Sequence, residues 1–360
     1  MSKSLGNGVD PIDIANRMGG EIVRLWVASV DFREDTAASE NLMARCAELY
    51  KKLRNTFRFL LGNLAGFDPV RDRVPENELL PLDRYMLART RDLTEKILDW
   101  YEAFEFHRIY QALNEFAIVD LSAFYLDVLK DRMYTFAPTS LARRSAQTVL
   151  WQITEALVRL VAPILTFTAD EIWEHLPKVE GREPSVHLAL FPKAEEIFSE
   201  DPAPVLAEWQ KLFAVRDDAF RAIEEGRKEG SLGKGLEAAV VFAAISGFTQ
   251  FLKSFSKETL QEFFNVSSVF IGDLNADSGE LRNLLGDAAY DLTKSTFANR
   301  SFAAFASRAI GTKCNRCWRY TDDTSSYGIW ENVCTRCQSA LKEMGIEPPQ
   351  IDGLQTEAVK

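Results

Sequence analysis

The chain has 360 residues, of which 46% are hydrophobic and 26% are charged, and its formal net charge at pH 7 is -11. This composition predicts a folded protein of two or three domains and excludes a largely disordered chain. The negative charge argues against indiscriminate binding to nucleic acid, although it leaves room for a local basic surface. The sequence shows neither a signal peptide nor a run of roughly 18 apolar residues, so we expect a cytoplasmic protein.

Two short helices are expected between residues 9 and 30. Asp10 can cap the first helix, and Pro11 suits its first position because no hydrogen bond to its nitrogen is needed there. Gly19 and Gly20 end this helix. The segment EIVRLWVASVDF that follows places its large apolar residues on one helical stripe.

A long amphipathic helix is predicted from about Ser39 to Gly66, since apolar residues recur there every three or four positions. Its opposite side carries basic residues against the single acid Glu48. These residues are Arg45, Lys51, Lys52, Arg54 and Arg58. Such a strip can contact nucleic-acid phosphates, or it can be a solvated face with salt bridges between successive turns; the scarcity of acids favours the first interpretation.

Three further long helices are expected at about 81–104, 107–132 and 139–176, each apolar on one side and joined by short connectors. Pro163 should kink or divide the last one, because proline lacks the N–H donor and crowds the preceding turn. Long helices with short links predict an antiparallel bundle.

A small α+β module is predicted after a proline-rich connector at 178–204. Its elements are a helix at 205–229, a buried strand in GLEAAVVFAA, a helix at 247–264 and a second strand in NVSSVFIGD. SFAAFASRAIG is a candidate third strand, and residues 280–297 are ambiguous. The tail EPPQIDGLQTEAVK is expected to be mobile.

Four of the five cysteines form two C-x2-C pairs separated by sixteen residues. They are Cys314, Cys317, Cys334 and Cys337. Two such turns can present four thiolates at the corners of a tetrahedron, which suits Zn2+ and leaves no position open for water, so we predict a structural zinc site. Disulfides or redox dithiols are the alternatives, which the double motif disfavours. Cys46 is predicted to be a buried core thiol.

The two cysteine turns also carry arginines and aromatic residues. These are Arg316, Trp318, Arg319, Tyr320, Trp330 and Arg336. Cations among exposed aromatic rings suit single-stranded RNA, because bases stack on the rings and arginines meet phosphates. Packing of a tryptophan beneath the zinc is the alternative.

Several stretches together resemble the class I aminoacyl-tRNA synthetases, and their isoleucine-specific family in particular. MSKSLGN resembles the K-M-S-K-S signature without its first lysine, and EIVRLWVASVDF resembles the segment that follows it. LYKKLRNTFRFLLGNL, LDRYML, RRSAQT and VAPILTFTADEIW are similar to helices of the anticodon-binding domain. GSLGKGLEAAVVF and the KCNRCW/CTRC pair resemble the C-terminal module of the bacterial type. The resemblance covers essentially the whole chain.

The resemblance implies a mainly α fold: an antiparallel helical-bundle anticodon-binding domain, a small α+β module and a C-terminal four-cysteine zinc knuckle. The implied segments are the end of a class I catalytic domain at 1–35, the anticodon-binding domain at 36–177, the connector at 178–204, the α+β junction module at 205–300, the zinc-binding module at 301–345 and a flexible tail at 346–360.

The resemblance also implies a parent reaction, the attachment of isoleucine to its tRNA through an isoleucyl-adenylate made from ATP with Mg2+. Lys3 matches the second signature lysine, which stabilises the charge that builds on the phosphates in the transition state. Ser2 and Ser4 would bind phosphate or pin the closed loop. The sequence contains no H-x-G-H motif, so we expect this chain to be inactive alone. Without the resemblance, Lys3 would be a solvated N-terminal residue.

The implied partner is the isoleucine-accepting tRNA, bound by a monomeric chain that binds neither DNA nor membranes. Two basic clusters would contact the tRNA backbone without reading its sequence. They are Lys51, Lys52, Arg54 and Arg58 on one helix, and Arg143 and Arg144 on another. Trp318, Tyr320 and Arg336 are the candidates for contacts with anticodon bases, with Arg316 and Arg319 beside them.

Three other functions fit part of the sequence. The chain could be a non-catalytic zinc-containing RNA-binding module or one half of a split synthetase. A zinc-finger DNA-repair protein with a similar four-cysteine knuckle would leave the long helical domain and RLWVAS unexplained.

Overall fold

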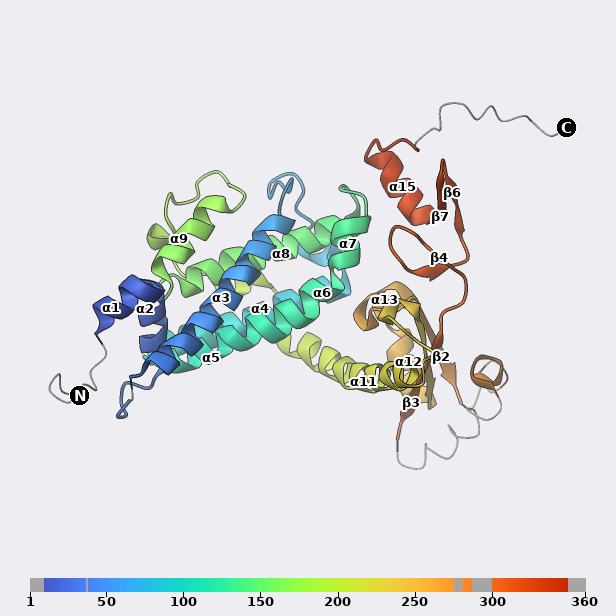
Figure 1. Cartoon of the computed structure of the whole chain (residues 1–360), viewed down its shortest axis with the longest axis horizontal. Coiled ribbons are helices and arrows are strands. Elements are labelled where there is room, and N and C mark those ends of the chain that lie inside the picture. Colours follow the sequence, from blue (N-terminus) through green and yellow to red (C-terminus); the bar gives the residue numbers. More distant parts are fainter. Residues whose placement is uncertain (1–9, 37, 275–278, 280, 287–299, 349–360) are drawn as a thin grey trace. The chain divides into compact units, whose positions relative to one another are not determined.

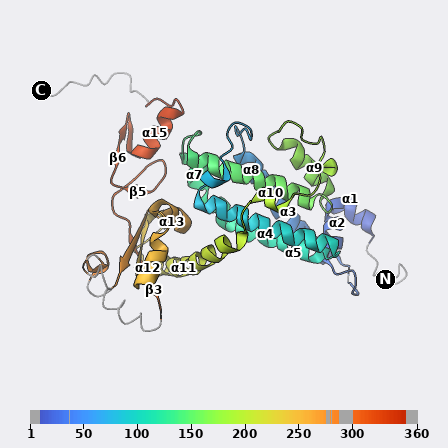
Figure 2. The ribbon, with the colours of Figure 1, turned by 180° about the vertical axis from the view of Figure 1, so that it is seen from behind.

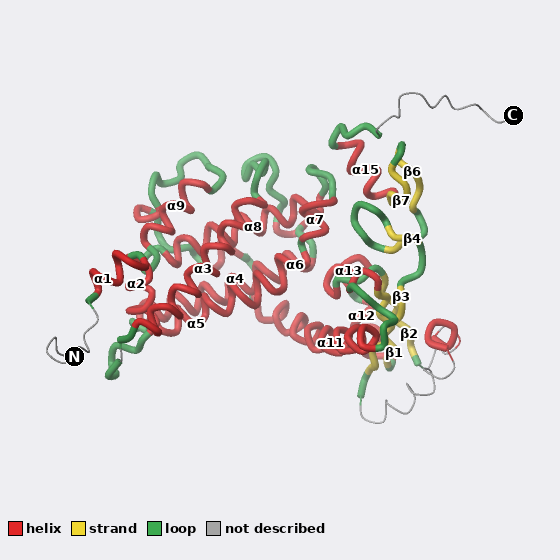
Figure 3. Tube along the Cα trace, viewed as in Figure 1, coloured by secondary structure: helices red, strands yellow, loops and turns green. Residues whose placement is uncertain are grey.

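The computed structural model describes residues 10–36, 38–274, 279, 281–286 and 300–348. Ser2, Lys3 and Ser4, most of the predicted tail and most of the ambiguous segment lie outside these ranges. The chain divides into two compact units, the first made of residues 1–129 and 141–206 and the second of residues 130–140 and 207–360. Helices dominate the first unit, whereas the strands belong to the second (Figure 3).

Two short helices, α1 (Pro11–Met18) and α2 (Gly20–Ser29), open the described part of the first unit, as the sequence predicts. Asp10 caps α1, because its side chain accepts a hydrogen bond from Ile12 N at 2.8 Å. Gly19 follows with a φ of 102°, a backbone conformation that favours glycine, and turns the chain into α2.

The rest of the first unit is a bundle of helices whose apolar sides meet. Its main helices are α3 (Glu40–Asn63), α4 (Pro81–Glu102), α5 (Phe106–Glu115), α8 (Leu141–Val161) and α9 (Thr166–His175), with η2 (Glu76–Glu78), η4 (Val186–Leu188) and α10 (Ala194–Ile197) in the connections. Helix α8 packs against both α3 and α4 (Figure 1), and α10 packs along α4 on the side seen in Figure 2. The predicted helical bundle is confirmed. None of the helices in the described ranges is long and apolar enough to cross a membrane.

The helix predicted at 107–132 is not continuous. After α5 the chain forms a π-helical segment, η3 (Phe116–Tyr125), and then the short helices α6 (Leu126–Val128) and α7 (Lys130–Thr135). The segment FAIVDLSAFY is apolar on most sides, so its sequence does not reveal the wider period.

Pro163 divides the last predicted helix into α8 and α9, as expected. Arg24 of α2 donates hydrogen bonds to the carbonyl oxygens of Pro163 and Ile164 at 2.6 and 2.9 Å. Glu21 accepts a hydrogen bond at 2.9 Å from Phe167 N, in the first turn of α9. Two side chains of α2 therefore satisfy backbone groups that the break leaves without helical partners.

The second unit is built on a three-stranded sheet with the order β2-β1-β3. The strands are β1 (Ala238–Ala244), β2 (Ser268–Asp273) and β3 (Phe302–Arg308), and α11 (Pro202–Lys228) precedes them. Strand β1 pairs in parallel with β2 and antiparallel with β3, and all seven of its residues are buried. A central strand covered on both faces requires a continuous apolar run, which AAVVFAA supplies.

The two faces of this sheet have different neighbours. Val241 and Ala243 share a buried cluster with Leu281. Phe242 lies at the intervening position of β1, and its ring centroid is 5.2 Å from that of Phe264. Alternate residues of β1 therefore serve two separate cores.

Two features of this unit differ from the prediction. The single helix expected at 247–264 is two helices, α12 (Ser246–Lys253) and α13 (Lys257–Phe264), because Ser256 caps α13 by accepting a hydrogen bond from Thr259 N at 3.1 Å. The predicted division at residue 300 assigns β3 to the zinc-binding module, whereas its pairing with β1 joins it to the sheet.

A buried polar cluster fixes the packing within the bundle. Asp83 of α4 is fully buried and accepts hydrogen bonds from the hydroxyl group of Tyr125, at 2.7 Å, and from that of Ser145 in α8. Ser145 accepts a further hydrogen bond from Leu80 N at 3.0 Å. Because buried polar groups without partners are costly, these bonds select one arrangement of the segments that carry them.

Removing one hydroxyl group tests this cluster. We expect Tyr125→Phe to lower the free energy of unfolding by about 1 to 3 kcal/mol, because Asp83 loses a buried hydrogen bond. Tyr134→Phe is the control, since that side chain is 60% exposed. Urea denaturation followed by circular dichroism measures both variants, and an unchanged midpoint for Tyr125→Phe would contradict this account.

Candidate functional site

The four predicted ligand cysteines come together in the second unit. Cys314 and Cys317 lie in the turn between β4 (Thr312–Lys313) and β5 (Tyr320–Thr321). Cys334 ends β7 (Trp330–Cys334), which pairs with β6 (Thr324–Tyr327), and Cys337 lies in the first turn of α15 (Thr335–Glu343). All four side chains are buried, and their sulfur atoms lie within 4.8 Å of one another.

The spacing of the sulfur atoms fits a four-coordinate metal ion and not a disulfide. Cys317 Sγ lies 3.8 Å from Cys334 Sγ. A tetrahedron with metal–sulfur bonds of about 2.3 Å has edges of about 3.8 Å, whereas bonded sulfur atoms lie about 2.05 Å apart. All five cysteines are free thiols, and Cys46 is buried on α3, as predicted. The four clustered cysteines can therefore hold one metal ion.

Hydrogen bonds favour the thiolate form of Cys317 in this cluster. The thiols of Cys334 and Cys337 donate to Cys317 and hold the pKa of its thiol well below its usual range, and the same hydrogen bonds raise the pKa of the two donors. The backbone N–H of Cys334 points at Cys314 Sγ, at an N to S distance of 3.4 Å. Thiolates are the form that binds metal, and four of them leave no open position for a water molecule, so the site suits a structural ion.

The backbone shapes the two cysteine turns. Trp318 N donates to Cys314 O at 2.9 Å and closes the first turn, where Trp318 has a left-handed φ of 66°. Asn315 joins the two turns: its backbone N–H donates to Asn332 O at 2.9 Å, and its side-chain amide donates to Glu331 O at 2.8 Å. The protein framework thus brings the two cysteine pairs together.

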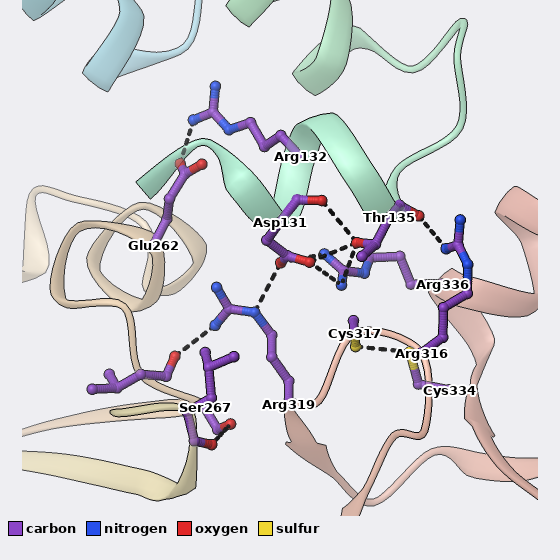
Figure 4. Close-up of polar contacts among 12 residues, drawn as sticks. Asp131, Arg132, Thr135, Glu262, Ser267, Arg316, Cys317, Arg319, Cys334 and Arg336 are labelled. Atoms are coloured by element: carbon purple, nitrogen blue, oxygen red, sulfur yellow. Dashed lines mark hydrogen bonds and ion pairs between the residues drawn. The ribbon is translucent and has the colours of Figure 1, made fainter. Parts of the chain in front are cut away.

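The three arginines beside the cysteines turn toward helix α7 (Figure 4). Arg319 Nε donates to Asp131 Oδ2 at 2.9 Å. Both terminal nitrogens of Arg336 donate to the two oxygens of Asp131, each at 2.9 Å. Arg316 donates to the carbonyl oxygen of Thr135. All three guanidinium groups are engaged within the protein, so their predicted role in RNA binding gains no support from this geometry.

Asp131 is the acceptor that Arg319 and Arg336 share, and its side chain is only 15% exposed. Burial opposes its ionisation, but the hydrogen bond from Arg336 and the charges of both arginines outweigh burial, so the pKa of Asp131 lies below its ordinary value. Asp131 is not among the residues that the sequence predicts to be functional. Asp131 is one acid in KDRMYT, 188 residues before Arg319, and no motif or period marks it.

The aromatic residues of the first turn differ in exposure. Trp318 is 57% exposed, and Lys234 Nζ lies 5.6 Å from the centroid of its ring. Tyr320 is half-buried, and its backbone N–H donates to Ser267 Oγ at 2.9 Å. Trp318 is therefore accessible for stacking, whereas Tyr320 is partly enclosed.

A hollow of about 530 Å³ lies beside the second cysteine turn, lined by Trp330, Ile329 and Leu341 with the polar side chains of Asn315 and Arg316 among others. Trp330 is 38% exposed, and its ring is stacked on that of Tyr327 at a centroid distance of 6.1 Å. A flat apolar group with polar edges would match this lining.

The predicted basic strip lies on the exposed side of α3. Lys51, Lys52, Arg54 and Arg58 are all exposed. Lys51 pairs with Glu48 at 2.7 Å, and Arg54 pairs at 3.3 Å with Glu171 of α9, an acid that the sequence of α3 cannot reveal. Among the described residues, Lys52 and Arg58 form no ion pair.

The second predicted basic cluster is mostly enclosed by the bundle. Arg144 is 14% exposed, forms an ion pair with Asp72 at 3.2 Å and donates to Gln147 at 2.8 Å. Arg143 is half-buried, and burial together with the charge of Arg144 lowers its pKa. The bundle uses the charge of Arg144 internally, so the predicted tRNA contact at Arg143 and Arg144 gains no support from this geometry.

Comparisons with known proteins find sequence similarity to tRNA ligases along most of the chain. The family "Anticodon-binding domain of tRNA ligase" matches residues 83–242, and the family "tRNA synthetases class I (I, L, M and V)" matches residues 1–39. The isoleucine–tRNA ligase of Moorella thermoacetica is 42% identical over 96% of this chain and 36% of its own length. Those of Symbiobacterium thermophilum and Staphylococcus haemolyticus are 40% and 41% identical over 96% of this chain, and over 36% and 35% of their own lengths.

The chain thus spans about a third of the length of the curated relatives it matches. A chain of the solved LeuRS–tRNA–LeuAMS complex from Agrobacterium radiobacter is 15% identical over 69% of this chain and 24% of that chain, with a TM-score of 0.40, which supports no inference. Over almost its whole length, this chain is thus homologous to the C-terminal part of isoleucine–tRNA ligases, which are class I aminoacyl-tRNA synthetases.

Proposed function

We propose that this chain is the tRNA-binding part of an isoleucine–tRNA ligase, whose parent reaction attaches isoleucine to its tRNA at the expense of ATP. The observation that carries the proposal is the similarity to isoleucine–tRNA ligases along almost the whole chain, which includes the anticodon-binding domain. The proposed partner is the isoleucine-accepting tRNA, the proposed compartment is the cytoplasm, and the chain acts as a monomer.

The tRNA backbone is proposed to lie along the exposed side of α3. Lys52 and Arg58 are exposed there without ion-pair partners among the described residues. Lys51 and Arg54 have partners, but exposed pairs of this kind contribute little stability because the solvent screens their charges. A phosphate can therefore replace either acid, and the whole strip is available to RNA.

The four cysteines are proposed to bind one structural Zn2+, which stabilises the module that carries Trp318 and Trp330. The exposed ring of Trp318 and the hollow beside Trp330 support contacts with unpaired bases, because stacking on aromatic rings is the common way to bind them. Arg316, Arg319 and Arg336 would then act through the position of this module.

The first residues of the chain are proposed to take part in catalysis in the intact enzyme. Ser2, Lys3 and Ser4 would belong to the loop that binds ATP with Mg2+ in the intact enzyme, as the match to class I synthetases at residues 1–39 suggests. The proposed domains have the boundaries predicted from the sequence, except that β3 belongs to the α+β junction module because it pairs with β1.

Removal of single cysteines tests the zinc proposal. We expect the purified chain to hold about one equivalent of zinc, and Cys337→Ser to hold much less, because a hydroxyl group is a poor substitute for a thiolate ligand. Cys46→Ala, which removes the one cysteine outside the cluster, should retain its zinc. Elemental analysis after dialysis measures the content, and equal zinc in the two variants would exclude this site.

Reversal of two charges tests the basic strip. We expect Lys52→Glu combined with Arg58→Glu to weaken tRNA binding at least about tenfold and to reduce the slope of log K against log salt by about 2, since two phosphate contacts are lost. The control combines Lys211→Glu with Lys228→Glu, which changes the net charge equally at two exposed positions of α11. Filter binding at several salt concentrations measures both, and equal losses would refute a specific role for α3.

A further inference from the structure

Three arginines beside the cysteines converge on one turn of α7 (Figure 4). Arg316 lies between the first two cysteines, Arg336 lies between the second two, and Arg319 follows the first pair. They donate to Asp131 and to the carbonyl oxygen of Thr135. Each half of the cysteine cluster therefore sends an arginine to the same turn.

Asp131 joins the two halves of the cluster. Its Oδ2 atom accepts hydrogen bonds from Arg319 Nε and from Arg336 Nη1, each at 2.9 Å. Both arginines can reach this one atom only while the two cysteine turns keep their spacing. A metal ion held by four thiolates would fix that spacing, because it sets the distances among the sulfur atoms.

The charges around Asp131 balance when the cysteine cluster holds Zn2+. The three guanidinium groups and the one carboxylate together carry a net charge of +2. Four thiolates around one Zn2+ together carry the opposite charge, about -2. Compensation matters here because the side chains of Asp131 and Arg319 are only 15% and 16% exposed.

Further contacts extend this surface along residues 130–140. The guanidinium group of Arg336 lies 4.2 Å from the centroid of the Phe136 ring. Thr139 N donates a hydrogen bond at 3.2 Å to Glu343, the last residue of α15. Residues 130–140 thus form a contact surface for the cysteine module, residues 312–343, with the partly buried carboxylate of Asp131 at its charged centre.

We propose that Asp131 is a positioning residue: when the four cysteines bind zinc, the cysteine module docks on residues 130–140 through Asp131, and this docking orients the exposed tryptophans of the module toward RNA. Asp131 acts through Arg319 and Arg336 and touches neither the metal nor the RNA. The inference rests on the zinc binding proposed above and adds that zinc controls the order of a segment almost 200 residues earlier in the chain.

The test compares Asp131→Asn with zinc chelation in the full chain. The measurements are zinc content, hydrogen exchange of the amides at 130–140, and affinity for an isoleucine-accepting tRNA transcript. In the wild type we expect chelation to raise exchange at 130–140 by at least about tenfold and to weaken RNA binding. We expect Asp131→Asn to bind as much zinc as the wild type. Its hydrogen exchange at 130–140 and its affinity for RNA should already equal those of the chelated wild type, and chelation should not change its exchange at 130–140 further.

Asp217→Asn is the matched control, because it makes the same chemical change at an exposed position of α11 and should behave as the wild type. If Asp131→Asn fails to fold or to retain zinc, Arg336→Lys decides by the same measurements, since it keeps the charge and removes the paired hydrogen bonds. If the amides at 130–140 stay protected from exchange in the zinc-loaded variant, or in the chelated wild type, the role proposed for Asp131 is wrong. The proposed zinc site would still stand. A wild-type chain that binds no zinc would overturn the proposed zinc site as well.

Discussion

The cysteine module depends on four buried thiols that form most of its small core and that together could hold one metal ion. Its strands are two to five residues long, and its buried cluster consists of the four cysteines with Tyr327, Val333 and Leu341. A segment of this size buries too little apolar surface to be stable alone, so such modules normally need a metal or disulfides. The sulfur spacing excludes disulfides here and matches a four-coordinate metal ion, so the proposed zinc would supply the missing stabilisation.

The cations of this acidic chain serve two purposes: some form ion pairs within the protein, and others are exposed to solvent. Arg319, Arg336 and Arg144 are partly buried and form ion pairs with Asp131 or Asp72, so their charges are used inside the protein. Lys52 and Arg58 on α3 are exposed and remain available to a polyanion. A net charge of -11 is therefore compatible with RNA binding, because several exposed cations share one face of α3 and form a local basic surface.

Local patterns were sufficient to predict most elements of the fold. Apolar periodicity predicts α3 and α4, proline chemistry predicts the break at Pro163, and the double C-x2-C motif predicts the cysteine cluster. These features depend on residues that are close in sequence, so their physical cause is visible there.

Tertiary contacts decided the features that the sequence did not reveal. The burial of Arg144 depends on Asp72, and the partner of Arg54 is Glu171 on another helix. The sequence around Asp131 does not mark it as functional. Its role depends on hydrogen bonds from Arg319 and Arg336, which are distant in the sequence. Sequence alone therefore located the cysteine cluster and the basic strip but could not tell which arginines are enclosed.

The proposed function requires this chain to select an isoleucine-accepting tRNA rather than any polyanion. The most direct measurement is competition at physiological salt between that tRNA, a tRNA with another anticodon, and a DNA duplex. The account predicts that the isoleucine-accepting tRNA binds at least about tenfold more tightly than either competitor, because base contacts add to the charge-dependent binding that all three share. Equal affinity for all three nucleic acids would contradict it.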